Sequence, residues 1–268
     1  MKCNFIPVNY NNSNITIDCI KTILNQKVPV RIVVVDNNST LDEQRKLTEF
    51  TKKYSECIDV LFLRKNIGYF PAINEGILYL GESLHSNYTV VGNNDLEFPS
   101  DFFEKLNGIS INDKTFAIAP DIITPCGVHQ NPLLMNKYSA FRKIMYDIFY
   151  SNYLFAQIIL FLTQKLSIAK SKKNRIGFDV QQNIAIPHGA CIILTEKFFE
   201  NFNLLDDTSF LFGEEILFAN QIKKCAGEVL YIPKLKVLHN EHSTINNMPS
   251  KTSYLLERKA YQVFKEYI

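Results

Sequence analysis

Hydrophobic and polar positions alternate in blocks over the first hundred residues. A continuous β-branched run at 30–35, bounded by Pro29 and Asp36, is typical of a strand buried on both faces. Further patterns predict strands at 3–9, 60–63 and 88–91 and helices at 15–24, 41–54 and 71–80. Because strands that alternate with helices form βαβ units, the pattern predicts an α/β fold with a central, mostly parallel sheet flanked by helices.

One residue conflicts with the first of these strands. Pro7 has no N–H to donate to a ladder and is expected on an edge or at a bulge. Beyond residue 100 the pattern is sparser. It predicts strands at 116–119, 190–194 and 229–232, helices at 196–202, 217–225 and 254–267, and otherwise loops over 101–135.

Residues 136–175 differ in composition from the rest of the chain. The first part is aromatic and aliphatic, and the end is basic with no intervening acid, at Lys165, Lys170, Lys172, Lys173 and Arg175. The uncharged run between Asp147 and Lys165 is shorter than the roughly 20 apolar residues of a spanning helix. We expect a segment that does not cross a membrane. It remains open whether 140–175 lies on an anionic membrane surface, packs as a helical flap or forms a dimer contact.

Composition and charge narrow the class of protein. The 268 residues are 46% hydrophobic, and a net charge of +2 gives no electrostatic argument for binding nucleic acid. None of the six cysteines forms a CxxC pair, so reduced thiols in a cytoplasmic protein are the simplest interpretation. The N-terminus also lacks the pattern of a signal peptide.

Polar residues follow each of the first four predicted strands, at 9–12, 36–40, 64–68 and 92–95. Open α/β sheets bind ligands beyond the carboxyl ends of their strands, so this edge is the expected site. Neither a GxGxxG nor a GxxxxGK[ST] motif is present to hold a phosphate. Asp95 is suitably placed to bind Mg²⁺ or Mn²⁺ beside a substrate phosphate, although a turn or cap role is the alternative.

Six strings extend this pattern: VNYNNSN at 8–14, VVVDNNST at 33–40, NIGYFPAINEGI at 66–77, VGNNDLEF at 91–98, HGACIILTEKFFE at 188–200 and FLFGEEILFANQIKKCAGEVLYIPKLKVLHNEHS at 210–243. Because these strings occur in this order and at these spacings, the chain resembles the family-2 nucleotide-sugar glycosyltransferases of GT-A fold, in particular the rhamnosyltransferase-like branch. The resemblance implies one catalytic domain. It would comprise a nucleotide-binding half at 1–100, an acceptor half at 101–245 with a helical insertion at 136–180, and a C-terminal helix at 246–268.

The resemblance also implies donor-binding residues. Asp36 would contact the pyrimidine base of the donor, and Asn9 and Asn11 would belong to the loop around the nucleoside. Asn66 and Gly68 would lie beside the ribose and diphosphate.

The metal site implied by the resemblance departs from the family pattern. Asn93-Asn94-Asp95 matches the DxD motif, with Asp95 as metal ligand and Asn93 in place of the first acid. The lost charge should weaken metal affinity. His239 matches a histidine that completes the site in several members, although it also suits a structural role at a strand end.

Glu214 and Glu215 match the acidic pair whose second member is the catalytic base. Acids at a helix N-terminus are also favoured by the helix dipole, and both explanations can hold together. Gly189 and Ala190 match a loop near the acceptor, where small residues allow close approach, although they also suit tight strand packing.

The implied function is inverting transfer of a sugar from a dTDP- or UDP-sugar donor. The resemblance favours dTDP-rhamnose, with UDP-hexoses or UDP-N-acetylhexosamines close behind. The acceptor would be a saccharide or a lipid-linked saccharide in cell-surface polysaccharide synthesis. A nucleotidyltransferase is the enzymatic alternative, but it would need a Gly-rich loop that is absent after the first strand. A non-catalytic sugar-nucleotide-binding homologue is the other alternative, because Asn93 and Glu215 both depart from the family pattern.

Overall fold

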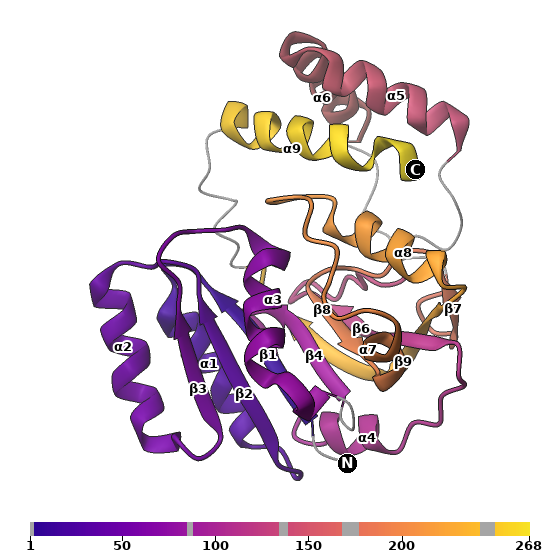
Figure 1. The fold of residues 1–268 in the computed structure, drawn as a ribbon. Helices are drawn as coiled ribbons and strands as arrows, with labels where there is room; N and C mark the ends of the chain where they lie inside the picture. Colours follow the sequence, from indigo (N-terminus) through magenta and orange to yellow (C-terminus); the bar gives the residue numbers. More distant parts are fainter. Residues whose placement is uncertain (1–2, 85–87, 134–138, 168–176, 242–249) are drawn as a thin grey trace.

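A computed structural model describes residues 3–84, 88–133, 139–167, 177–241 and 250–268 of the chain. Within them one sheet has the strand order β3-β2-β1-β4-β8-β6-β9-β5, with β7 paired to β9 (Figure 1). The strands are β1 (Cys3–Asn9), β2 (Val30–Asp36), β3 (Ile58–Phe62), β4 (Tyr88–Asn93), β5 (Leu96–Glu97), β6 (Thr115–Ile123), β7 (Gln182–Ile184), β8 (Cys191–Leu194) and β9 (Glu228–His239). The α/β class with a central sheet is confirmed.

The strands of the first half pair in parallel, whereas β8, β5 and β7 run antiparallel to their neighbours. Alternate residues of β2 enter two separate cores: Ile32 and Val34 pack on one side of the sheet, and Val33 and Val35 on the other. The β-branched run is therefore buried on both faces, as its pattern predicts.

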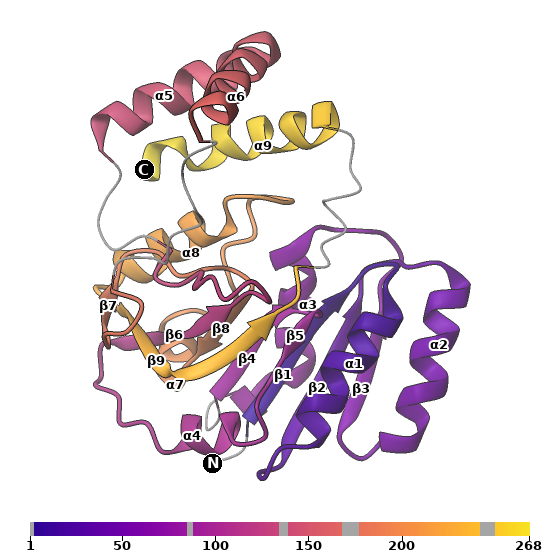
Figure 2. The same ribbon diagram turned by 180° about the vertical axis from the view of Figure 1, so that it is seen from behind.

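Helices cover both faces of the sheet, as the two ribbon views show (Figures 1 and 2). The first core receives side chains from α1 (Ser13–Leu24), α2 (Leu41–Thr51) and α4 (Phe102–Asn107). The second receives them from α3 (Tyr69–Leu80), α7 (Glu196–Asn201) and α8 (Glu214–Lys224).

Pro7 lies in an interior strand, contrary to the expectation of an edge or bulge. The β1 strand runs between β2 and β4. Its pairing with β2 is interrupted between Phe5↔Ile32 and Val8↔Val35 and then resumes in the same register. The gap coincides with the proline, which has no N–H to donate, so the sheet tolerates it at the cost of local ladder bonds.

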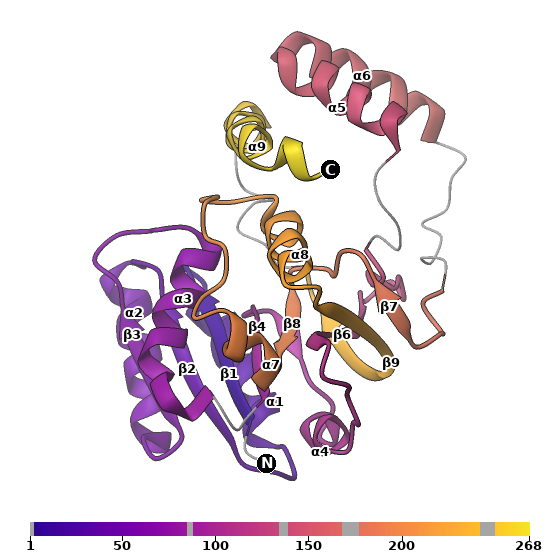
Figure 3. The same cartoon turned by 45° about the vertical axis from the view of Figure 1, so that its right-hand side comes forward.

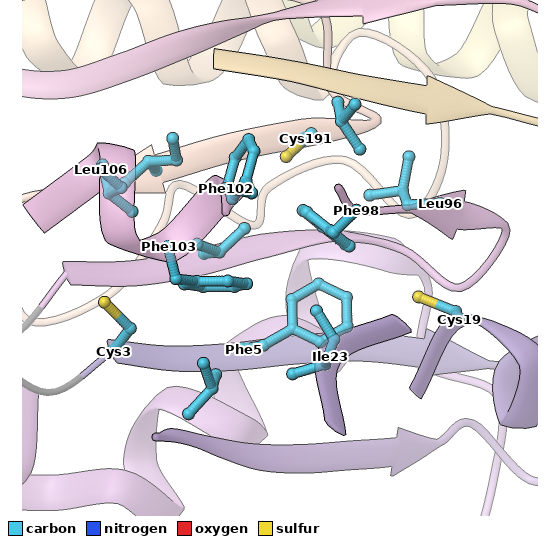
Figure 4. Close-up of a cluster of buried hydrophobic side chains, with 14 of the residues drawn as sticks. Cys3, Phe5, Cys19, Ile23, Leu96, Phe98, Phe102, Phe103, Leu106 and Cys191 are labelled. Atoms are coloured by element: carbon cyan, nitrogen blue, oxygen red, sulfur yellow. The ribbon is translucent and has the colours of Figure 1, made fainter. Parts of the chain in front are cut away.

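The helix α4 is missing from the sequence-based expectation, which assigned loops to that region. It contributes Phe102 and Phe103 to an aromatic cluster with Phe5 and Phe98 (Figure 4). The ring centroids in this cluster lie 4.9–5.7 Å apart. Six residues are too few to display a helical period, and β5 and β7 are shorter still.

A further layer of helices lies beyond α8 (Figures 1 and 3). The helix α9 (Ser250–Phe264) packs next to α8, and α5 (Ala140–Ser151) and α6 (Tyr153–Ser167) lie outside α9. The predicted helical insertion is thus present, although Lys170, Lys172, Lys173 and Arg175 lie outside the described residues. Among the helices of the described ranges, none combines the length and apolar character needed to cross a bilayer.

Candidate active site

A cavity of about 360 Å³ lies where β1, β2 and β4 end, and the loops before α3 and α8 complete its wall. Its lining includes Asp95 and Glu215, the two residues on which the sequence-based mechanism depends. The other predicted site residues that line it are Asn66, Gly68, Asn93, Gly189, Ala190 and Glu214.

Long-range strand pairing assembles the predicted metal side of this cavity. Because β5 pairs with β9 antiparallel, Leu96 lies opposite His239. This pairing brings the His239 Nε2 atom to 3.3 Å from Oδ1 of Asp95 and 3.2 Å from Nδ2 of Asn93. Asp95 and His239 are both buried.

A neighbouring glutamine sets the orientation and tautomer of His239. The Gln130 amide N–H donates to Glu241 Oε1 at 3.1 Å, which leaves its Oε1 facing His239 Nδ1 at 2.7 Å. This network assigns the proton of the imidazole to Nδ1. The Nε2 lone pair then faces Asn93 and Asp95. A ring fixed through its second nitrogen is the usual arrangement of a metal-binding histidine.

These donors fit a hard divalent cation that shares its ligands with a substrate. In the described part of the chain, no group of three or more His, Cys, Asp or Glu side chains is arranged to enclose a metal. Two protein ligands suit Mg²⁺ or Mn²⁺, which take further oxygens from phosphate and water.

The acidic pair begins α8, and Gly213 in the left-handed conformation (φ 78°) precedes it. Glu214 is buried, and within the described residues its Oε1 has no hydrogen-bond partner. Burial, followed by the charge of Glu215, raises the pKa of Glu214 to about 8. Burial also raises the pKa of Glu215, but its Oε1 accepts a hydrogen bond from the Gly189 N–H at 3.3 Å, which opposes the rise. Burial therefore favours the neutral form of Glu214, whereas the hydrogen bond from the Gly189 N–H favours the charged form of Glu215.

Asn9 and Asp36 lie behind the cavity wall rather than in its lining. Both are fully buried, and Asn9 Nδ2 donates to Asp36 Oδ2 at 2.7 Å. The Asp36 carboxylate also accepts from the Ser39 N–H and from Gln44. Asn11, at φ 55°, joins the same loops through its Oδ1, which accepts from the Thr40 N–H. In this structure the three residues hold together the loops that follow β1 and β2, and their contacts with a donor stay predictions.

The loop at Asn66 and Gly68 is tied to two other segments. Asn37 Nδ2 donates to Asn66 Oδ1 and to the Gly68 carbonyl, at 3.1 and 2.8 Å. Gly68 has φ 101°, and a Cβ there would lie 2.2 Å from the Phe210 carbonyl oxygen. Only glycine allows this approach, by which the loop before α3 contacts the loop before α8.

Several cavity residues received no role from sequence reasoning, among them Asn37, Tyr69 and His188. The Ala190 N–H donates to His188 Nδ1 at 3.1 Å, and the His188 and His239 rings lie 5.9 Å apart. The only sequence signal for His188 is its position at the start of the string at 188–200. The Tyr69 hydroxyl donates a hydrogen bond to the Gly189 carbonyl. The only sequence signal for Tyr69 is its position directly after Gly68.

Comparison with known proteins identifies the class. The model of glycosyl transferase family 2 matches residues 5–201, so the chain belongs to that family. Its fold is of the GT-A type. None of the curated protein sequences matches it.

Two solved structures share the fold. One is the crystal structure of GalNAc-T7 with UDP, GalNAc and Mn²⁺, with a TM-score of 0.65 at 15% identity; the alignment covers 100% of this chain and 49% of that one. The other is the mannosyltransferase PcManGT from Pyrobaculum calidifontis in complex with GDP-Man and Mn²⁺, with a TM-score of 0.56 at 12% identity. That alignment covers 97% of this chain and 69% of the other. The chain thus spans about half the length of the first of these proteins.

Proposed function

We propose that the chain is a metal-dependent, inverting glycosyltransferase that uses a nucleoside-diphosphate sugar. The supporting observation is one cavity whose lining brings Asp95 together with the buried Glu214 and the half-buried Glu215. The oriented imidazole of His239, outside the lining, lies 3.3 Å from Asp95. Tyr69 lies close to Asp95 and to both glutamates. Its pKa is raised well above the usual range by burial, and the charges of Glu214, Glu215 and Asp95 contribute to the rise.

In this proposal the donor diphosphate lies at Asp95 and His239. A divalent cation held by these two residues would supply positive charge for the departing nucleoside diphosphate. The neighbouring structures were solved with UDP or GDP-Man and with Mn²⁺, which supports a nucleotide-sugar donor. The choice of dTDP or UDP and of rhamnose rests on the resemblance at the six sequence strings.

Glu215 acts as the base in the proposed reaction. Its carboxylate accepts the proton of an acceptor hydroxyl while that oxygen attacks the anomeric carbon. The bond from this carbon to the diphosphate oxygen breaks in the same step, so the configuration inverts. Glu214, with its raised pKa, holds a proton near neutral pH and limits the pair at the start of α8 to one negative charge. The proposed acceptor is a saccharide or lipid-linked saccharide hydroxyl, in cell-surface polysaccharide synthesis.

The test compares Glu215→Gln with Glu75→Gln, which removes an exposed carboxylate on α3. We expect Glu215→Gln to abolish sugar transfer from a panel of dTDP- and UDP-sugars while calorimetry still detects donor binding. Glu75→Gln should behave as the unchanged chain. An Asp95→Ala variant should lose the part of donor binding that Mn²⁺ adds.

Full turnover in Glu215→Gln would remove this residue from the mechanism. Donor binding with neither hydrolysis nor transfer in the unchanged chain, for every sugar of the panel, would favour the non-catalytic homologue instead.

A further inference from the structure

The loop at 188–190 joins the two sides of the cavity. The Ala190 carbonyl accepts a hydrogen bond from the Asn93 N–H at 2.9 Å, on the side of the predicted metal site. The Gly189 N–H donates to Glu215 Oε1 at 3.3 Å, on the side of the proposed base. Because consecutive residues of one short loop contact both sides, the placement of this loop affects where the Glu215 carboxylate lies.

Glycine at position 189 allows a close approach but leaves the backbone flexible. A Cβ there would lie 2.8 Å from Glu215 Oε1, so the approach of the loop to the carboxylate depends on glycine. Glycine also has the greatest backbone freedom of all residues. Gly189 links two peptide planes, of which one carries the N–H that faces Glu215 and the other carries the Gly189 carbonyl. Contacts from elsewhere in the fold are therefore needed to hold these planes in place.

Two side chains supply such contacts. The Asn131 side chain is fully buried and joins the loop to β6, because it accepts from the His188 N–H and donates to the Pro120 carbonyl, both at 2.8 Å. The Tyr69 hydroxyl donates to the Gly189 carbonyl at 3.3 Å. Tyr69 therefore holds the residue whose own N–H faces the proposed base, whereas Asn131 holds the residue before it.

Tyr69 is a rigid support for this contact. It is the first residue of α3, and its side chain packs against the hydrophobic core on that side of the sheet. Its main-chain N–H donates to the Phe210 carbonyl at 3.1 Å, in the loop before α8. Burial, together with the neighbouring carboxylates, keeps the pKa of the Tyr69 hydroxyl well above its usual range. The hydroxyl therefore stays protonated and able to donate at neutral pH.

We propose that Tyr69 is a positioning residue for Glu215 and acts through the backbone of Gly189. It fixes the peptide that follows Gly189 and thereby limits rotation of the peptide whose N–H contacts the carboxylate. The inference rests on the proposed function, because it takes Glu215 as the base. The effect of Tyr69 on the Glu215 carboxylate can be measured without any sugar transfer, so this inference and the proposed reaction can fail separately.

The experiment compares Tyr69→Phe, which removes only the hydroxyl, with Tyr254→Phe as the matched control. The Tyr254 hydroxyl also donates to a backbone carbonyl, that of Phe149 at 3.1 Å, but it lies in the helical layer of α5 and α9. In each variant the Glu215 carboxyl is titrated by NMR with glutamate that is isotope-labelled at the carboxyl carbon. Its signal is assigned from its absence in Glu215→Gln, and circular dichroism verifies the fold.

We expect Tyr69→Phe to raise the pKa of Glu215 by roughly half a unit to one unit, because a weaker N–H contact stabilises the charged carboxylate less. Glu214 is retained in both variants, so its charge does not account for a difference between them. In an active chain, the acidic limb of the pH profile of kcat/KM should move to higher pH by the same amount. The kcat should fall by roughly threefold to thirtyfold, with the donor KM nearly unchanged. Tyr254→Phe should alter none of these quantities.

An unchanged pKa of Glu215 in Tyr69→Phe would overturn the inference, whether or not the chain transfers sugar. A raised donor KM with the acidic limb in its original place would also overturn it, because that result is expected from a lost contact with the substrate. If the pKa rises but the unchanged chain neither transfers nor hydrolyses any donor of the panel, the positioning of Glu215 by Tyr69 is supported and the proposed reaction fails.

Discussion

Gly189 lies against the carboxylate of Glu215, so one added methyl group can test the geometry of the proposed base. A Cβ at residue 189 would lie 2.8 Å from Glu215 Oε1 and 3.1 Å from its Cγ and Cδ. Ordinary contact begins at 3.4 Å. The Gly189→Ala substitution therefore forces the carboxylate to withdraw by about 0.6 Å, and misplacement on this scale lowers catalytic rates by roughly tenfold or more.

The cost of this substitution should appear in catalysis and not in folding. The obstructing atoms are the end of a flexible side chain, which can move without disturbing the backbone. We expect kcat to fall by roughly tenfold to a hundredfold, with donor KM and the melting temperature nearly unchanged. Steady-state kinetics with the donor that the panel identifies, together with thermal unfolding, measure these quantities.

Gly108→Ala is the matched control, because a Cβ there meets only Lys105 O and Glu104 O at ordinary distances of 3.6 and 3.8 Å. It should leave kcat unchanged. An unchanged kcat in Gly189→Ala would refute the assignment of Glu215 as the base.

Three further predictions concern the metal side, the buried acid and the core. Gln130→Leu removes the acceptor that orients His239 and should weaken Mn²⁺ binding by about tenfold or more in calorimetry, with the fold retained. Burial raises the pKa of Glu214 to about 8, whereas its ordinary value is 4.5. Between pH 4.5 and 8 the folded chain therefore keeps a proton that the unfolded chain releases, and the free energy of unfolding falls as the pH rises through this range. Glu214→Gln should therefore stabilise the chain by up to about 3 kcal/mol at pH 7 in urea unfolding and hardly at all at pH 4.5; an equal gain at both values would contradict this reasoning. Phe103→Ala should cost about 3–5 kcal/mol, because it empties a fully buried site in the aromatic cluster, and a loss below about 1 kcal/mol would show that the cluster refills it.

The sequence determined the elements whose hydrophobic pattern is long enough to have a period. The buried strand at 30–35, the helices of the first half and the polar residues that follow the strands can all be predicted without coordinates. The six sequence strings also pointed to the family that the comparison shows. This information is local, since a period of 2 or 3.6 residues is set by which face of an element is buried.

Only the tertiary structure decided which of these residues share a site. His239 reaches Asn93 across 146 positions of sequence because β5 and β9 pair antiparallel, and the glutamine that orients it carries no motif. The tertiary structure also places Asp36 behind the cavity wall. The position of Asp36 at a strand end in the sequence does not reveal this. Pairing and burial of this kind depend on contacts between segments far apart along the chain, so no local pattern contains them.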